Sequence, residues 1–131
     1  MIPFEARRLP EEPDAVAPDG SDVRVLLQLA GGSMAHFALH AGRTARAVRH
    51  RTVEEIWYVL SGRGEMWRRV GGQEEIVSME PGVCLTIPVG TAFQFRALKD
   101  APLSVVGVTM PPWPGPDEAV LVEGPWKPTA S

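Results

Sequence analysis

The sequence predicts an all-β fold in which short antiparallel strands form a sandwich or a barrel. Gly and Pro each occur 13 times in 131 residues, a content that is unusual for a helical bundle but typical of a chain that turns often. Apolar and polar residues alternate along the central segments, which is the period of a strand rather than that of a helix. Gly or Pro separates most of these segments. The length is that of one globular domain.

The N-terminal segment, residues 1–19, is predicted to be an extended arm because it is rich in proline and precedes the first strand signal. The first strand follows it, with polar residues such as Arg24 and Gln28 on one face. The other face is apolar and comprises Val23, Val25, Leu27 and Leu29.

Eight further segments are rich in β-branched or aromatic residues and are predicted to be strands. In chain order they are residues 34–39, 45–50, 56–60, 65–70, 74–79, 83–87, 92–96 and 103–110. Turn signals such as Gly71-Gly72 and Pro81-Gly82 lie in the gaps between them. The barrel domain is therefore expected to span residues 20–110.

The C-terminal segment, residues 111–131, holds six of the 13 prolines and two of the four tryptophans. Trp113 and Trp126 would be a solubility liability if the segment were free in solvent. We therefore predict a C-terminal arm that docks on the barrel or on a partner subunit.

The charge and cysteine content excludes several classes of partner. The chain has 13 basic and 16 acidic residues and a net charge of -3, so it lacks the basic footprint of a nucleic-acid-binding protein. Cys84 is the only cysteine and cannot form an intramolecular disulfide. The sequence shows no apolar stretch of the length of a signal peptide or a membrane span. We expect a cytoplasmic protein with neither a nucleic-acid nor a membrane partner.

A first spaced motif runs from Gly42 to Gly62. It resembles the first motif of the cupin family, which has Gly, five residues, His, one residue, His, three or four residues, Glu, six residues and Gly. In that frame His50 stands at the second His, Glu55 at the carboxylate and Gly62 at the closing glycine. Val48 stands where the family has its first His.

A second spaced motif begins at Gly82. It resembles the second cupin motif, which has Gly, five residues, Pro, one residue, Gly, two residues, His, three residues and Asn. Pro88 and Gly90 match this frame. Phe93 stands at the position of the third His and Ala97 at that of the Asn. The framework residues are thus present, and the metal ligand of this motif is not.

The resemblance implies a jelly-roll barrel of the double-stranded β-helix type. Metal-binding cupins hold Fe, Mn, Ni, Cu or Zn with three His and one Glu, of which this chain keeps His50 and Glu55. Two protein ligands are normally too few for a divalent transition metal, so we expect none bound and keep a metal held by His50 and Glu55 as the alternative. His36 and His40 are candidate replacement ligands or, more simply, hydrogen-bonded strand histidines.

His50 and Glu55 are also candidate catalytic residues. A carboxylate that binds a histidine fixes its tautomer and raises its basicity, which is the minimum of an acid/base site. The cupin superfamily includes sugar isomerases and epimerases that use such a histidine without a metal. The alternative interpretation is a satisfied polar contact in a binding pocket.

Four further residues are candidates for ligand binding. Arg46 shares the predicted face of His50 and could bind an anionic group such as a carboxylate or phosphate. Trp57, Phe93 and Phe95 share inward parity in their strands and could line an aromatic pocket. A filled hydrophobic core explains these three aromatic residues equally well.

These observations favour a small-molecule-binding cupin with a degenerate metal site and an aromatic-lined pocket. A metal-dependent dioxygenase or isomerase is one alternative, and metal-free acid/base catalysis by His50 is another. Unpaired sheet edges and the tryptophan-bearing tail further predict a homodimer.

Overall fold

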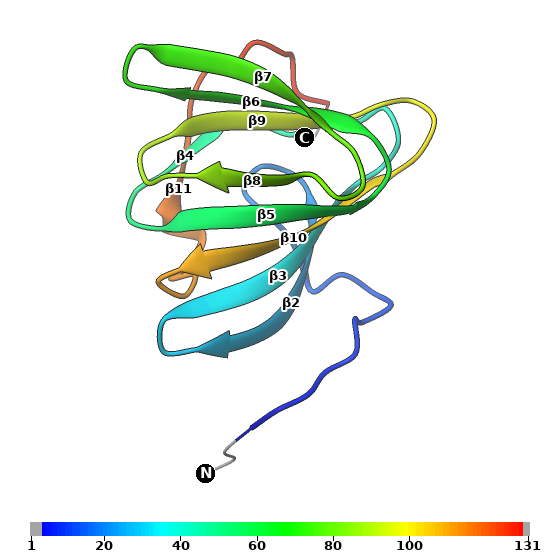
Figure 1. Cartoon of the computed structure of the whole chain (residues 1–131), viewed down its shortest axis with the longest axis vertical. Helices are drawn as coiled ribbons and strands as arrows, with labels where there is room; N and C mark the ends of the chain where they lie inside the picture. Colours follow the sequence, from blue (N-terminus) through cyan, green and yellow to red (C-terminus); the bar gives the residue numbers. More distant parts are fainter. Residues whose placement is uncertain (1–3, 130–131) are drawn as a thin grey trace.

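The computed structural model describes residues 4–129, and in it two antiparallel sheets enclose a common core (Figure 1). The six-stranded sheet comprises, in spatial order, β1 (Ala15–Val16), β2 (Asp22–Leu29), β3 (Gly32–Leu39), β10 (Leu103–Met110), β5 (Glu54–Ser61) and β8 (Cys84–Ile87). The five-stranded sheet comprises β11 (Ala119–Leu121), β4 (Val48–His50), β9 (Ala92–Ala97), β6 (Gly64–Val70) and β7 (Gln73–Met79). A short 3-10 helix, η1 (Pro116–Glu118), precedes β11.

The topology is that of a jelly roll. Strand β10 lies between β3 and β5, and β9 lies between β4 and β6, so each sheet pairs strands that are distant in sequence. This arrangement is a double-stranded β-helix and confirms the predicted all-β fold class. No helix in residues 4–129 is long and apolar enough to cross a membrane.

Strand β5 shows how the alternating sequence places the site. Glu55, Trp57 and Val59 are buried, whereas Ile56 and Tyr58 between them are exposed. Successive side chains of a strand point to opposite faces of its sheet. Glu55 and Trp57 therefore point together into the space between the two sheets.

The predicted strand over residues 45–50 is shorter than expected, because β4 begins only at Val48. The backbone N–H of Arg46 donates to the carbonyl of Asp19 at 2.7 Å, outside the sheet. This bond takes Arg46 out of the strand ladder. The parity argument that placed Arg46 on the face of His50 therefore does not hold.

The extended arms are not confirmed in the form predicted, because both terminal segments contribute strands. β1 pairs with β2 in the six-stranded sheet, and β11 pairs with β4 in the five-stranded sheet. The last described residues also contact the barrel, where the N–H of Thr129 donates to the carbonyl of Thr44 at 3.0 Å. Residues 1–3 and 130–131 of the predicted arms lie outside the described residues.

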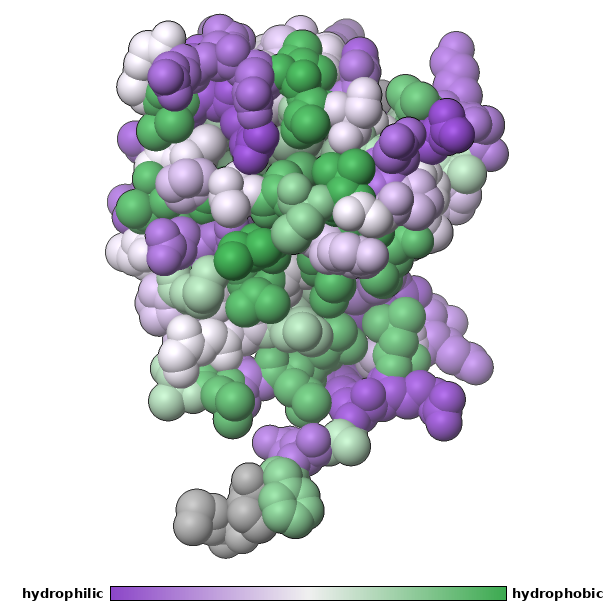
Figure 2. All heavy atoms as spheres, in the orientation of Figure 1, coloured by the Kyte–Doolittle hydropathy of each residue, from purple (hydrophilic) through white to green (hydrophobic). Residues whose placement is uncertain are grey.

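The outer face of the six-stranded sheet is partly apolar. Ile56, Tyr58 and Leu60 of β5 are exposed. Figure 2 shows apolar side chains gathered over the middle of the view, where Figure 1 places β5, β8 and β10. No partner chain tests the homodimer, which stays a prediction.

Candidate functional site

A cavity of about 440 Å³ lies between the two sheets. Its walls come from both sheets, from the segment that precedes β2 and from the segment that follows β10. The walls are mostly apolar and include Val23, Val25, Met34, Phe37, Val48, Trp57, Phe93 and Trp113. The polar side chains that line it are Asp19, Gln28, Ser33, His50, Glu55 and Thr109.

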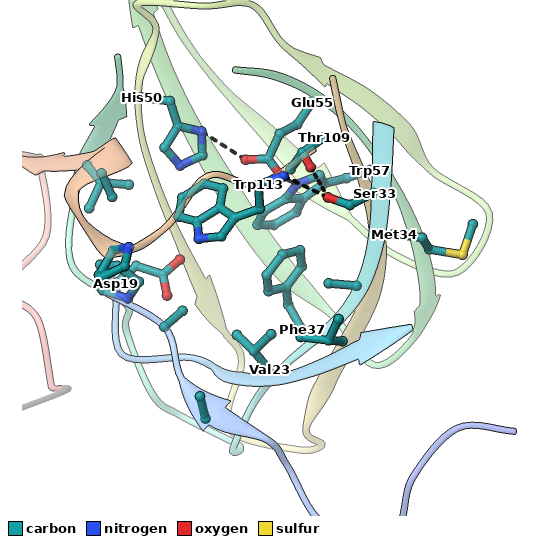
Figure 3. Close-up of a pocket in the computed structure, with 18 of the residues that line it drawn as sticks. Asp19, Val23, Ser33, Met34, Phe37, His50, Glu55, Trp57, Thr109 and Trp113 are labelled. Atoms are coloured by element: carbon teal, nitrogen blue, oxygen red, sulfur yellow. Dashed lines mark hydrogen bonds and ion pairs between the residues drawn. The ribbon is translucent and has the colours of Figure 1, made fainter. Parts of the chain in front are cut away.

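His50 and Glu55 meet at one wall of this cavity (Figure 3). The Nδ1 atom of His50 lies 3.0 Å from Oε2 of Glu55, and both side chains are buried. The ring N–H is not aligned with this oxygen, so the contact has the distance of an ion pair without the geometry of a hydrogen bond. The Nε2 atom of His50 is left as the ring nitrogen that a ligand could contact.

The second carboxylate oxygen of Glu55 is also engaged. The indole Nε1–H of Trp57 donates to Oε1 of Glu55 at 2.9 Å. Residues two apart on a strand share a face, which explains how β5 supplies both partners. Glu55 is therefore fixed from two sides, by His50 on β4 and by Trp57 on its own strand.

Aromatic rings surround this polar pair. Phe93 and Trp113 approach the ring of His50 edge-on, with centroid distances of 5.2 and 5.1 Å. Phe37 stacks on Trp57 at 5.2 Å. The backbone N–H of Trp113 donates to Oγ of Ser33 at 2.9 Å, which fixes this tryptophan beside the cavity.

Asp19 brings a second carboxyl group into the cavity. It is buried, and its Oδ1 atom accepts hydrogen bonds from the N–H and the hydroxyl of Ser21 at 3.0 and 2.7 Å. Burial raises the pKa of Asp19, and the charge of Glu55 adds to this effect. The hydrogen bonds from Ser21 and the charge of His50 lower the pKa but do not outweigh burial.

Glu118 of η1 holds the loop between β4 and β5. Its carboxylate accepts hydrogen bonds from the N–H and hydroxyl of Thr52, both at 2.6 Å, and from the N–H of Val53 at 2.8 Å. Burial raises the pKa of Glu118, but these hydrogen bonds and the charge of His50 outweigh burial and lower it. The C-terminal segment thus anchors the loop that connects His50 on β4 with Glu55 on β5.

The comparison with known proteins identifies the family. The sequence profile of the cupin domain matches residues 35–109, which is more than half of the chain. The chain belongs to the cupin family. It is also 29% identical over 111 residues to an uncharacterized protein of Methanocaldococcus jannaschii, across 81% of this chain and 86% of that protein.

Solved structures share the cupin fold at low sequence identity. A Bacillus halodurans protein, BH2720, is 18% identical with a TM-score of 0.64, over 78% of this chain and 76% of that one. KdgF from Halomonas sp. is 18% identical with a TM-score of 0.62, over 75% and 85% of the two chains. A double-stranded β-helix protein from Klebsiella pneumoniae is 18% identical with a TM-score of 0.63, over 79% and 85%.

The predicted ligand-binding residues of this cupin fall into two groups. Trp57 and Phe93 line the cavity together with His50. Phe95 and Arg46 are not among its described lining residues. Phe95 is buried in the core, where its ring meets Trp57 edge-on at 5.0 Å. The guanidinium of Arg46 instead donates to the carbonyl of Pro18 at 3.3 Å.

Neither of the other two histidines is among the described residues that line the cavity. His36 is buried with no described partner for Nδ1, and burial together with the charge of Arg24 lowers its pKa. His40 is exposed and lies 3.3 Å from a carboxylate oxygen of Asp22. The cavity therefore has one described histidine, His50.

The donor set of this cupin does not fit the metal that the family resemblance implies. Among residues 4–129, no group of three or more His, Cys, Asp or Glu side chains is placed to hold a metal ion. Val48 and Phe93 pair across β4 and β9 and both line the cavity. Apolar side chains therefore occupy two of the family's ligand positions, and His50 and Glu55 alone are too few ligands to hold a divalent transition metal tightly.

Sequence reasoning did not single out Asp19, Ser33 or Thr109 as site residues. The dipeptide Pro18-Asp19 followed by Gly20 is a typical turn signal. The structure has this turn, with the N–H of Gly20 donating to the carbonyl of Ala17 at 2.8 Å. The signal predicts the turn, but it does not reveal that the turn folds over the cavity.

Proposed function

We propose that this cupin binds a small, largely apolar molecule in the cavity, beside the buried His50–Glu55 pair. The observation that carries the proposal is a buried polar pair on the wall of a mostly apolar cavity that four aromatic side chains help to line. Aromatic walls with a few placed polar groups are typical of small-molecule sites.

The size of the cavity supports binding rather than incomplete packing. Protein interiors are close-packed and contain few voids larger than a water molecule. The cavity here measures about 440 Å³, within the range of roughly 300 to 1,000 Å³ of ligand pockets. A small aromatic molecule would fit in this volume.

A cavity-filling substitution tests this proposal. Ala35 lines the cavity, whereas Ala38 on the same strand lines a second, smaller hollow. We expect uncharged aromatic alcohols such as 2-phenylethanol to bind the wild-type protein in isothermal titration calorimetry. Ala35→Leu should remove this binding, and Ala38→Leu should leave it unchanged. Equal binding by both variants would place the ligand elsewhere and overturn the proposal.

Metal-free acid/base catalysis is a second candidate function, and the position of His50 favours it. Glu55 contacts Nδ1 of His50, which would leave Nε2 to take a proton from a bound substrate or give one to it. In a screen of sugars and aromatic carbonyl compounds for proton exchange with D₂O, His50→Ala should abolish any turnover found and preserve binding. Turnover that survives in His50→Ala would rule out this role.

A further inference from the structure

The charges that line the cavity are unbalanced. Its described lining residues include the carboxyl groups of Asp19 and Glu55 and the imidazole of His50, but neither a lysine nor an arginine. An anionic ligand would therefore meet two carboxyl groups in a site of low dielectric constant, with His50 as the single basic group. This arrangement opposes the anionic ligand that Arg46 was expected to bind.

The walls of the cavity favour positive charge in a second way. The rings of Phe37, Trp57, Phe93 and Trp113 all line it. The face of an aromatic ring carries partial negative charge and attracts an ammonium group, most strongly where water is excluded. Aromatic walls and carboxyl groups together are the usual means by which proteins recognise an organic cation.

Asp19 is the carboxyl group with a free oxygen in this cavity. Its side chain is only 7% exposed, and the hydrogen bonds from Ser21 both reach Oδ1. Within residues 4–129 no hydrogen bond to Oδ2 is present, whereas both oxygens of Glu55 have partners. Figure 3 shows the carboxyl group of Asp19 directed into the cavity.

The turn that carries Asp19 is held in place from outside the cavity. The backbone N–H of Arg46 donates a hydrogen bond to the carbonyl of Asp19, and its guanidinium donates one to the carbonyl of Pro18. Arg46 thus acts on the backbone of the turn, and it leaves Oδ2 of Asp19 available. Burial of this carboxyl group raises its pKa, a cost that a bound cation would offset.

We propose that the cavity takes an aromatic or otherwise apolar amine in its protonated form, and that the carboxylate of Asp19 binds the ammonium group. This inference rests on the proposed binding function and narrows its ligand to a class. The aromatic walls would hold the apolar part of the amine and the π-faces would supplement Asp19.

Three probes of nearly the same shape test the charge preference. They are 2-phenylethylamine, 2-phenylethanol and phenylacetate, each titrated by calorimetry at pH 7 and constant ionic strength. We expect the amine to bind about tenfold more tightly than the alcohol, and phenylacetate to bind most weakly. Binding of phenylacetate as tightly as the amine would overturn the inference. Binding of none of the three would overturn the proposed function itself.

Asp19→Asn tests the assigned residue. Asn keeps an Oδ1 acceptor for Ser21, so the turn should be retained, and a cooperative unfolding transition in urea verifies that the variant is folded. We expect the preference for the amine over the alcohol to fall to about twofold or less. Asp22→Asn is the matched control, since Asp22 lies outside the cavity beside His40. An amine preference that persists in Asp19→Asn would contradict the assignment to Asp19.

Discussion

The two tryptophans of the C-terminal segment lie in regions that differ in packing. Trp113 stands beside His50 at the wall of a hollow cavity. Trp126 packs in a filled cluster, with the guanidinium of Arg96 4.0 Å from its ring centroid. A tryptophan in a proline-rich tail indicates that the tail is ordered, but it does not distinguish a binding wall from a packing anchor. Changes at Trp113 should therefore affect binding, and changes around Trp126 should affect stability.

The largest loss of stability is expected from Gln94→Ala, because Gln94 binds the backbone of Trp126 and so anchors the C-terminal segment. Gln94 is fully buried and donates from Nε2 to the carbonyls of Ala45 and Trp126, at 2.9 and 2.8 Å. Its Oε1 atom accepts from the N–H of Trp126 at 3.2 Å. The substitution leaves these groups unpaired and should lower the free energy of unfolding by about 3 kcal/mol in urea denaturation. A loss below about 1 kcal/mol would show that the tail is not held there.

The two tryptophans can then be compared directly. Trp126→Ala should lower the free energy of unfolding by about 2 kcal/mol, because a half-buried ring and its cation–π contact are lost. Trp113→Ala should cost less, about 1 kcal/mol, but weaken binding of 2-phenylethanol about tenfold. Denaturation and calorimetry on both variants provide the comparison. The reverse pattern would contradict the division between wall and anchor.

Glu118 provides a further test of this comparison, because its hydrogen bonds to Thr52 and Val53 anchor the part of the C-terminal segment that lies near the cavity. Its folded-state pKa lies below the ordinary value of 4.5, so its ionised form stabilises the folded chain. This contribution is fully present above pH 4.5 and is lost as the pH falls through the folded-state pKa. Glu118→Gln should therefore cost about 1 kcal/mol at pH 7 and progressively less below pH 4.5. A cost that is independent of pH would exclude the ionised carboxylate as its source.

The smallest effect is expected from metal removal. The described residues offer no group of three metal-ligating side chains, so stability should not depend on an ion. Treatment with EDTA should change the Tm by less than about 1 °C. A stoichiometric metal detected by mass spectrometry, together with a Tm that falls by many degrees, would require a ligand set that includes His50.

The fold was predictable because its signals are local. Alternating residues in β5 and turns at Gly or Pro are each set within a few positions of the sequence. The inward position of Trp57 followed from the same alternation, whereas the pairing of His50 with Glu55 was expected from the resemblance to the first cupin motif. Strand β11 was missed because residues 119–121 follow a proline-rich stretch whose composition indicates an arm.

The rest of the site depends on contacts between distant segments. Asp19 reaches the cavity because the backbone of Arg46 binds its turn, and Trp113 because its N–H binds Ser33. The same contact with the turn removed Arg46 from the predicted pocket face. Such contacts leave no periodic pattern in the sequence, so neither residue could be placed without the structure.

The occupancy of the cavity is tested most directly by the four indole N–H signals in a ¹H–¹⁵N NMR spectrum, assigned by single Trp→Phe substitutions. Trp57 and Trp113 line the cavity, whereas Trp67 and Trp126 belong to the filled cluster. On titration with 2-phenylethanol, the signals of Trp57 and Trp113 should shift and saturate while the other two stay in place. Saturable shifts confined to Trp67 and Trp126, or no shift at any of the four, would contradict ligand binding in this cavity.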